Sequence, residues 1–173
     1  MYFIGTFTKL KDAPILEKSG FDAVSNYIFL ADWKNSKKKP IQKYSELVGE
    51  RESDWNRIRE EISIPYYPTA VPGWDAWPRA EHIDFEDAAG HYPHTPVVIE
   101  STAENFGMML EKSMDYIQSA NKDPLFDCVI AAWNEMSEGC SLLPRVHYCD
   151  GRIMYDDSMI MKTRSIIDGF PKY

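Results

Sequence analysis

The sequence is poor in several features that would assign a protein to a class at once. Its 173 residues contain no apolar run near the roughly 20 residues needed to cross a bilayer, so we expect no membrane span. Lysine and arginine number 19 against 27 acidic residues, and the net charge is −8. This balance argues against a nucleic-acid partner, because phosphates require clustered basic side chains.

Cysteine is scarce, and the start of the chain shows no targeting signal. Cys128, Cys140 and Cys149 form an odd number without metal-ligand spacing, so we expect free thiols. A Cys140–Cys149 bridge stays open only for an oxidising compartment. Residues 1–12 lack the basic segment and cleavage site of a secretory signal. Both observations favour the cytoplasm without assigning the location.

Several catalytic motifs are missing as well. The sequence has no glycine-rich phosphate loop, no G-x-S-x-G elbow and no cysteine–histidine signature, which leaves nucleotide-binding and acyl-transfer functions without support. His91 and His94 raise the hypothesis of a metal-dependent hydrolase, but no third ligand follows in a spacing such as H-E-x-x-H. An ordinary loop is the favoured interpretation, and we predict neither a metal nor a cofactor.

What the chain does contain is an alternation of strand-like and helix-like segments. Strands are predicted over residues 1–7, 21–29, 64–75 and 127–135, the last apolar enough to be buried on both faces. Helical segments are predicted over residues 9–20, 44–62, 101–122 and 156–170. Residues 31–43 and 75–96 are expected to be loops, and residues 96–101 a short strand or a helix entry. The alternation predicts right-handed βαβ units and a parallel sheet.

The predicted fold class is α/β, of the (β/α) barrel type. A closed (β/α)8 barrel needs eight units and about 250 residues, whereas this chain supplies four units. We therefore predict one partial domain over residues 1–173, the C-terminal half of a TIM-like barrel, truncated at its N-terminus. Open sheet edges are costly, so a homodimer or a missing N-terminal half is expected to complete the barrel.

Polar and aromatic residues gather where the predicted strands end. Asn26 and Tyr27 follow the second strand, residues 72–75 follow the third, and residues 133–135 follow the fourth. Functional groups of barrel enzymes lie at this end of the strands. Five tryptophans and ten tyrosines add rings that can stack on the flat faces of sugars.

Three segments resemble a known family. AAWNEMSEGCSLLP (residues 131–144) resembles the signature A-W-N-E-W-x-E-G-x-x-L-E-P of the WbsX family, in the glycoside hydrolase family 99-like clan. TAVPGWDAWPR (residues 69–79) resembles its P-G-W-D-N-x-P-R segment, and FDAVSNYIF (residues 21–29) its F-D-A-x-x-x-Y strand. The resemblance covers nearly the whole chain, but only the second half of a typical member.

The resemblance implies a (β/α)8 barrel protein of polysaccharide processing or lipopolysaccharide O-antigen assembly. Such proteins are classed as glycosyl hydrolases or glycosyltransferases, with an oligosaccharide or polysaccharide substrate. The chain departs from the pattern at Met136, where tryptophan is usual, at Leu143, where glutamate is usual, and at Ala76, where asparagine is usual. These departures bear on sugar contacts and on activity more than on the fold.

Glu135 and Glu138 are the candidate catalytic residues, because glycosidic chemistry uses a carboxylic acid and a carboxylate. The alternative is a surface turn whose acids are only solvated. Arg79 suits recognition of a carboxylate or phosphate, or a local ion pair with Asp75. The predicted sugar-contacting residues are Asn26, Tyr27, Trp74, Asp75, Arg79, Trp133 and Asn134.

Two functions from different classes follow. The first is a carbohydrate-active enzyme that uses Glu135 as acid–base or substrate-orienting carboxylate, with Glu138 beside it. The second is a non-catalytic carbohydrate-binding or interaction fragment that lacks the other half of the barrel. Hydrolysis and transfer both stay open, as do retention and inversion at the sugar.

Overall fold

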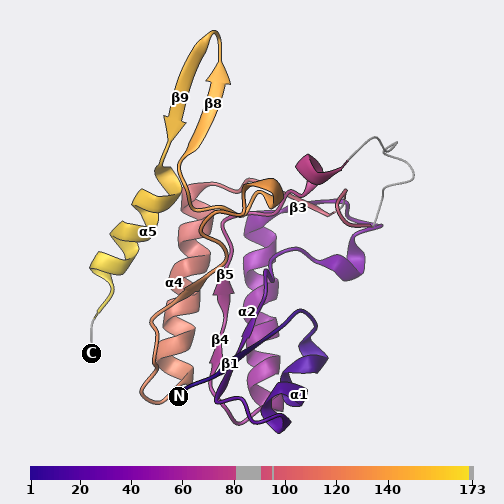
Figure 1. Cartoon of the computed structure of the whole chain (residues 1–173), viewed down its shortest axis with the longest axis vertical. Coiled ribbons are helices and arrows are strands. Elements are labelled where there is room, and N and C mark those ends of the chain that lie inside the picture. The colour runs from indigo at the N-terminus through magenta and orange to yellow at the C-terminus, as the bar shows by residue number, and fades with distance from the viewer. Residues whose placement is uncertain (81–90, 95, 172–173) are drawn as a thin grey trace.

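The protein has a mixed α/β fold in which parallel strands alternate with helices (Figure 1). The structure, a computed structural model, describes residues 1–80, 91–94 and 96–171. The strands are β1 (Ile4–Phe7), β2 (Ala23–Asn26), β3 (Ile41–Lys43), β4 (Tyr66–Tyr67), β5 (Thr69–Ala70), β6 (Val97–Ile99), β7 (Val129–Ile130), β8 (Arg145–Cys149) and β9 (Arg152–Asp156). The helices are α1 (Ala13–Lys18), α2 (Tyr44–Glu61), α4 (Ala103–Ala120) and α5 (Ser158–Gly169), with 3-10 turns η1 (Leu10–Asp12), η2 (Trp33–Asn35), η3 (Trp77–Arg79) and η4 (Met136–Glu138).

The strands form small sheets rather than one continuous sheet. β2 lies between β1 and β4, β5 pairs with β7, and β3 pairs with β6, all in parallel. Pro68 separates β4 from β5, because proline has no N–H to donate to a strand ladder. The predicted α/β class with parallel pairing is confirmed, while the strands of the described residues do not close into a barrel.

The four predicted helical segments all contain helices. Thr102 caps α4, since its side chain accepts a hydrogen bond from the backbone N–H of Asn105 at 3.2 Å. The predicted apolar face of α4 is buried, namely Phe106, Met109, Leu110, Met114 and Ile117. The same holds on α2 for Leu47, Trp55 and Ile58.

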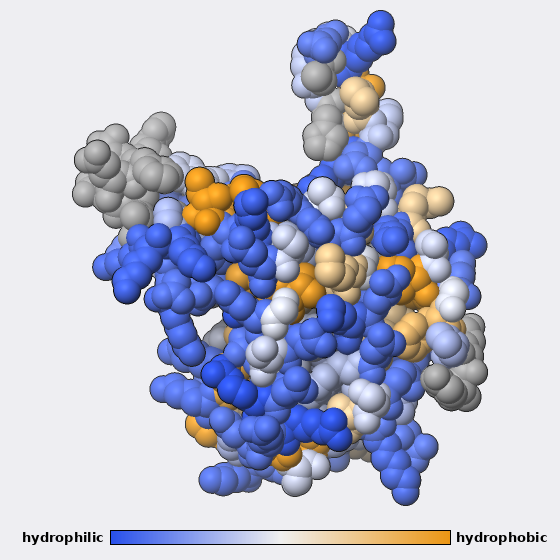
Figure 2. Space-filling model, turned by 180° about the vertical axis from the view of Figure 1, so that it is seen from behind, coloured by the Kyte–Doolittle hydropathy of each residue, from blue (hydrophilic) through white to orange (hydrophobic). Residues whose placement is uncertain are grey.

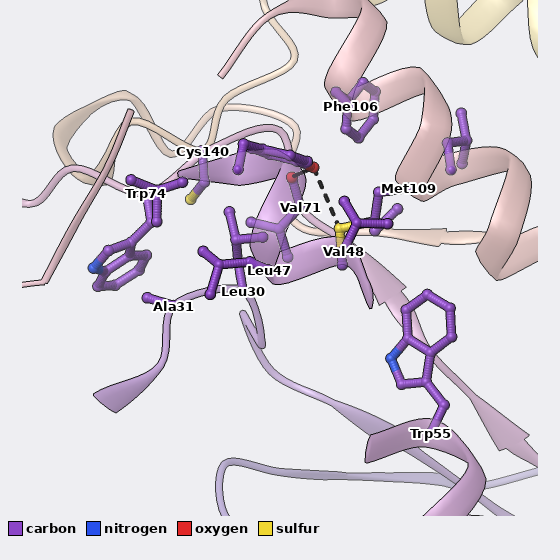
Figure 3. Packing of buried hydrophobic residues seen from close by; sticks show 14 of the residues in the cluster. Leu30, Ala31, Leu47, Val48, Trp55, Val71, Trp74, Phe106, Met109 and Cys140 are labelled. Atoms are coloured by element: carbon purple, nitrogen blue, oxygen red, sulfur yellow. Dashed lines mark hydrogen bonds between the residues drawn. The ribbon is translucent and has the colours of Figure 1, made fainter. Parts of the chain in front are cut away.

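Those two helices hold the main hydrophobic core against the strands. α2 and α4 contact each other and run alongside β4 and β5 (Figure 1). Figure 3 shows Trp55 and Trp74 at opposite ends of the core, with Val48, Val71 and Met109 between them. Because Trp74 belongs to the loop that follows β5, the core reaches the region where functional groups were predicted.

The prediction for residues 127–135 was wrong in its burial and length. Only Val129 and Ile130 form a strand, both are partly exposed, and Trp133 is 58% exposed. Within the described residues β7 pairs with β5 alone, so its other edge is not shielded by a neighbouring strand. The apolar run therefore reflects an edge strand and not one buried on both faces.

The antiparallel hairpin of β8 and β9 was not predicted. It stands clear of the body of the protein in both views (Figures 1 and 2). Its turn is Asp150–Gly151, and both residues have positive φ, at 50° and 74°. Asp-Gly between two β-prone segments is a strong hairpin signal, so the sequence contained the information.

Two further predictions concern chemistry rather than shape. Cys128 and Cys140 are free thiols, as predicted, while the side chain of Cys149 lies outside those that the structure describes. Among the described residues, no helix has both the length and the apolar character required to cross a membrane.

Candidate functional site: an arginine-clamped carboxylate pair beside a cavity

Arg79 joins the two glutamates that the sequence singled out. Its Nη2 donates to Glu135 Oε1 at 2.7 Å, and its Nη1 donates to Glu138 Oε1 at 2.9 Å. Its Nε donates to Ser137 Oγ at 2.8 Å, and that hydroxyl donates to Glu135 at 2.7 Å. One guanidinium therefore orients both carboxylates, which uses the planar, multiple-donor geometry specific to arginine.

Tyr92 completes this cluster from a third segment of the chain. Its hydroxyl accepts a hydrogen bond from Arg79 Nη1 at 2.8 Å and donates one to Glu138 Oε1 at 2.9 Å. The Glu138 side chain is only 8% exposed, whereas those of Glu135 and Arg79 are 29% and 38% exposed. Each carboxylate thus has two donors, and Glu138 is the better shielded of the two.

Close backbone packing brings the two loops of the cluster together. The Asp75 N–H donates to the Glu138 carbonyl at 2.8 Å, which ties the loop after β5 to η4. Gly139 ends η4 with a φ of 66°, a conformation that glycine adopts without strain. A Cβ on Gly73 would lie 2.7 Å from the Gly139 carbonyl oxygen. Both motif segments therefore need glycine where they touch.

The cluster shifts the ionisation of the groups around it. The hydrogen bond from Ser137 and the charge of Arg79 lower the pKa of Glu135, so Glu135 is ionised at neutral pH. The hydrogen bond with Tyr92, with the charges of the two glutamates, raises the pKa of Arg79. Burial, with the nearby glutamates, raises the pKa of Cys140 to about 12, which keeps this thiol protonated and unreactive.

A cavity of about 980 Å³ opens beside the cluster. Its wall comes from the loops that follow β1 and β2, from one face of α2, and from Trp74, Tyr92 and Glu138. Among the cluster residues, Glu138 and Tyr92 line it, whereas Glu135 and Arg79 do not. Its volume lies at the upper end of the range for small-molecule sites.

Aromatic rings cover one side of the cavity. Trp33 packs edge-on against Trp74 with ring centroids 5.7 Å apart, and the Tyr92 ring lies tilted to Trp74 with centroids 6.4 Å apart. Tyr27 also lines the cavity and remains exposed, so its ring is available to a ligand. Such a row of rings beside a carboxylate suits the alternating apolar and polar faces of a sugar.

The predicted site residues divide into those at the cavity and those away from it. Trp74, Tyr27 and Glu138 line it. Asn26 lies in the core, 2% exposed, where its Oδ1 accepts from the Tyr66 hydroxyl at 2.6 Å and the Thr69 N–H at 3.1 Å. Through these two hydrogen bonds Asn26 joins β2 to β4 and β5. A contact between Asn26 and a sugar stays a prediction.

The remaining predicted residues flank the cluster. Trp133 and Asn134 are exposed and do not belong to the cavity wall. Asp75 accepts a hydrogen bond from the Trp77 N–H at 3.0 Å, which fixes the start of η3. The suggested Asp75–Arg79 pair is wrong, because Arg79 forms its ion pairs with Glu135 and Glu138.

Sequence patterns did not single out Tyr92 and Ser137. Tyr92 stands between the two histidines of HYPH, where attention fell on a possible metal site. His94 is buried against the edge of Trp77, with ring centroids 5.3 Å apart. In the described part of the chain, no three His, Cys, Asp or Glu side chains converge on a possible metal position. Ser137 lies between the two glutamates, so proximity in sequence was its only signal.

Comparison with known protein families assigns the chain. The family described as glycosyltransferase WbsX matches residues 6–154, well over half of the sequence. The chain belongs to the glycosyltransferase WbsX family. Comparisons with curated proteins and with solved structures found no match.

The WbsX match spans both motif loops of the clamp and the predicted second strand, so the suspected resemblance is confirmed. It supports a role connected with carbohydrates. The departures from the family pattern occupy different environments: Met136 is exposed at the tip of η4, whereas Ala76 is buried in the core. Met136 therefore changes the exposed surface near the cluster, whereas Ala76 changes the buried packing of the loop that carries Arg79.

Proposed function

We propose that this chain acts on glycosidic bonds of a saccharide bound in the cavity beside the arginine clamp. The observation that carries the proposal is the convergence of Glu135 and Glu138 on Arg79, with Glu138 at the cavity wall next to aromatic rings. Family membership supports a carbohydrate substrate. The rings of Tyr27, Trp74 and Tyr92 would bind sugar faces, and Glu138 would meet the reacting atoms.

In the proposed reaction the two glutamates have different roles. Glu138 removes the proton of an acceptor hydroxyl, from water or from another sugar, as that oxygen bonds to the anomeric carbon. The former bond from the anomeric carbon to the leaving oxygen breaks, and the leaving oxygen departs with the bonding electrons and takes up the proton that Glu138 removed, directly or through water. Glu135, which stays ionised with a lowered pKa, adds negative charge that stabilises the oxocarbenium-like transition state.

Glu138→Gln tests this assignment. The variant retains the size of the side chain but loses the proton acceptor, so turnover is expected to fall by about a hundredfold, with binding changed little. The assay presents mannose-, rhamnose- and glucose-containing oligosaccharides, with water or an added sugar as acceptor. Glu111→Gln, on the exposed face of α4, is the matched control and should retain full activity. Equal turnover in wild type and Glu138→Gln would rule out Glu138 as the base.

One observation favours the second function, a saccharide-binding module without chemistry. Arg79 contacts both carboxylates at 2.9 Å or less, so both already have a fixed partner before any ligand enters. Such a hydrogen-bonded cluster also serves to hold a binding wall in place. Saccharide binding without turnover, in the wild type as in Glu138→Gln, would support this function over catalysis.

We also propose that the strands make up the C-terminal half of a (β/α)8 barrel. The parallel order β1, β2, β4 continues from β4 through Pro68 into β5 and then to β7. This order places β1 and β7 at the two sides, where backbone groups are available to a further strand. A second copy is then expected to cover these edges.

Light scattering at micromolar concentration tests the association. The expected result is a dimer that dissociates on dilution, because the edges are covered only by mass action. A monomer that stays stable and soluble over the whole concentration range would contradict a barrel completed by a second copy.

A further inference from the structure

The cavity is basic although the chain is acidic. Five basic and three acidic side chains line it, whereas the whole chain carries a net charge of −8. Two of the basic groups, Arg51 and Arg57, share the carboxylate of Asp54 at 3.2 and 2.5 Å, and Arg51 also pairs with Glu50 at 3.4 Å. The excess positive charge therefore comes from lysines.

Three lysines supply it, and they come from two separate loops. Lys9 and Lys11 follow β1, and Lys34 lies in η2 after β2. Among the described residues, no ion pair or hydrogen bond of their ammonium groups is found. Lys43 and Lys112, outside the cavity, instead pair with Glu100 at 3.6 Å and Glu52 at 2.7 Å. The three ammonium groups of the wall are thus not offset by a contacting acidic side chain within the described residues, as those of Lys43 and Lys112 are.

The acidic groups of the wall offset only part of this charge. Glu138 shares the guanidinium of Arg79 with Glu135. Asp32 keeps its charge, but its carboxylate accepts hydrogen bonds from the backbone N–H groups of Lys34 and Asn35 and from the Asn35 side chain as the cap of η2. Glu61 is the third acid of the wall. Five basic against three acidic side chains leave an excess of positive charge at the cavity, where low-dielectric walls strengthen it.

We propose that the cavity takes an anionic saccharide, whose carboxylate or phosphate is held by Lys9, Lys11 and Lys34 while its sugar rings lie against the aromatic side. This inference rests on the proposed function and adds the charge of the substrate to it. The lysines are exposed and flexible, so they act as point charges that tolerate either a carboxylate or a phosphate. Arg79, which the sequence suggested for binding an anion, instead pairs with the two glutamates.

The test compares binding of matched ligands by calorimetry. The ligands are a glucuronate-containing disaccharide, its neutral glucose counterpart and glucose 6-phosphate, each at low and at high ionic strength. The variant Lys9→Gln/Lys11→Gln/Lys34→Gln removes the three charges. The control Lys18→Gln/Lys37→Gln/Lys38→Gln removes the same charge from exposed lysines outside the wall.

Wild type and control are expected to bind an anionic ligand about tenfold or more tightly than the neutral one, with the preference weakened by salt. The cavity variant should lose that preference and bind the neutral ligand as before. Preference for glucuronate identifies a carboxylate as the anion, and preference for glucose 6-phosphate identifies a phosphate. Equal binding of neutral and anionic ligands by the wild type, or an unchanged preference in the cavity variant, would overturn this inference alone. Absence of binding to every saccharide would overturn it together with the proposed function.

Discussion

Arg79→Gln is expected to reduce saccharide turnover by at least about a thousandfold. Arg79 orients Glu135 through Nη2 and Glu138 through Nη1, so its loss frees both carboxylates at once. Misplacement of one reacting group by about 1 Å already costs on the order of a hundredfold, and here two groups lose their fixed position. Arg79→Lys keeps the positive charge but lacks the planar guanidinium that donates to both carboxylates. Its turnover should therefore fall between that of the wild type and that of Arg79→Gln.

The same variant is expected to change the response to acid. The folded protein lowers the pKa of Glu135, so this carboxylate contributes stability that is present above its ordinary pKa of 4.5 and lost as the pH falls through the lowered value. Removal of Arg79 takes away one cause of the lowering and leaves the hydrogen bond from Ser137. The midpoint of acid unfolding, followed by tryptophan fluorescence, should therefore move to higher pH.

Arg164→Gln is the matched control for both measurements. Arg164 forms an exposed pair with Asp168 on α5, at 3.3 Å, far in sequence from the clamp. Its loss should leave turnover and the acid midpoint unchanged, because exposed pairs contribute little. Near-normal turnover in Arg79→Gln would mean that the clamp is not part of the chemistry and would favour the binding module.

Gly73→Ala is expected to destabilise the protein by about 2–3 kcal/mol. The added Cβ would lie 2.7 Å from the Gly139 carbonyl oxygen and 2.9 Å from Ser101 Oγ, closer than atoms tolerate. The backbone oxygen cannot move without shifting η4, which carries Glu138. The loss of stability should therefore come with a loss of saccharide binding.

Urea unfolding of Gly73→Ala and Gly49→Ala side by side separates the clash from the general effect of replacing glycine. Gly49 lies inside α2, and a Cβ there meets nothing within 4 Å. Gly49→Ala should raise stability by about 0.5–1 kcal/mol, since alanine favours the helix. A Gly73→Ala protein as stable as the wild type would show that the two loops are not held in close contact.

The sequence determined the parts of the protein that depend on local pattern. Helical periodicity identified α2 and α4, because a helix that packs on one side must repeat its apolar residues every three or four positions. Motifs at and just beyond the predicted strand ends likewise identified four residues of the site, Glu135, Glu138, Arg79 and Trp74. The hairpin of β8 and β9 was equally readable from Asp150–Gly151 and was overlooked.

Only the tertiary structure decided which of these residues meet. Arg79 and the two glutamates are more than fifty positions apart in the sequence. Close backbone packing of Gly73 against Gly139 brings their loops together. Arg79 therefore pairs with Glu135 and Glu138 and not with the nearby Asp75. Burial likewise placed Asn26 inside and Trp133 outside, although both stand at strand ends. The basic wall joins Lys9, Lys11 and Lys34 from two loops. Such long-range packing sums many weak contacts, and no local pattern in the sequence records it.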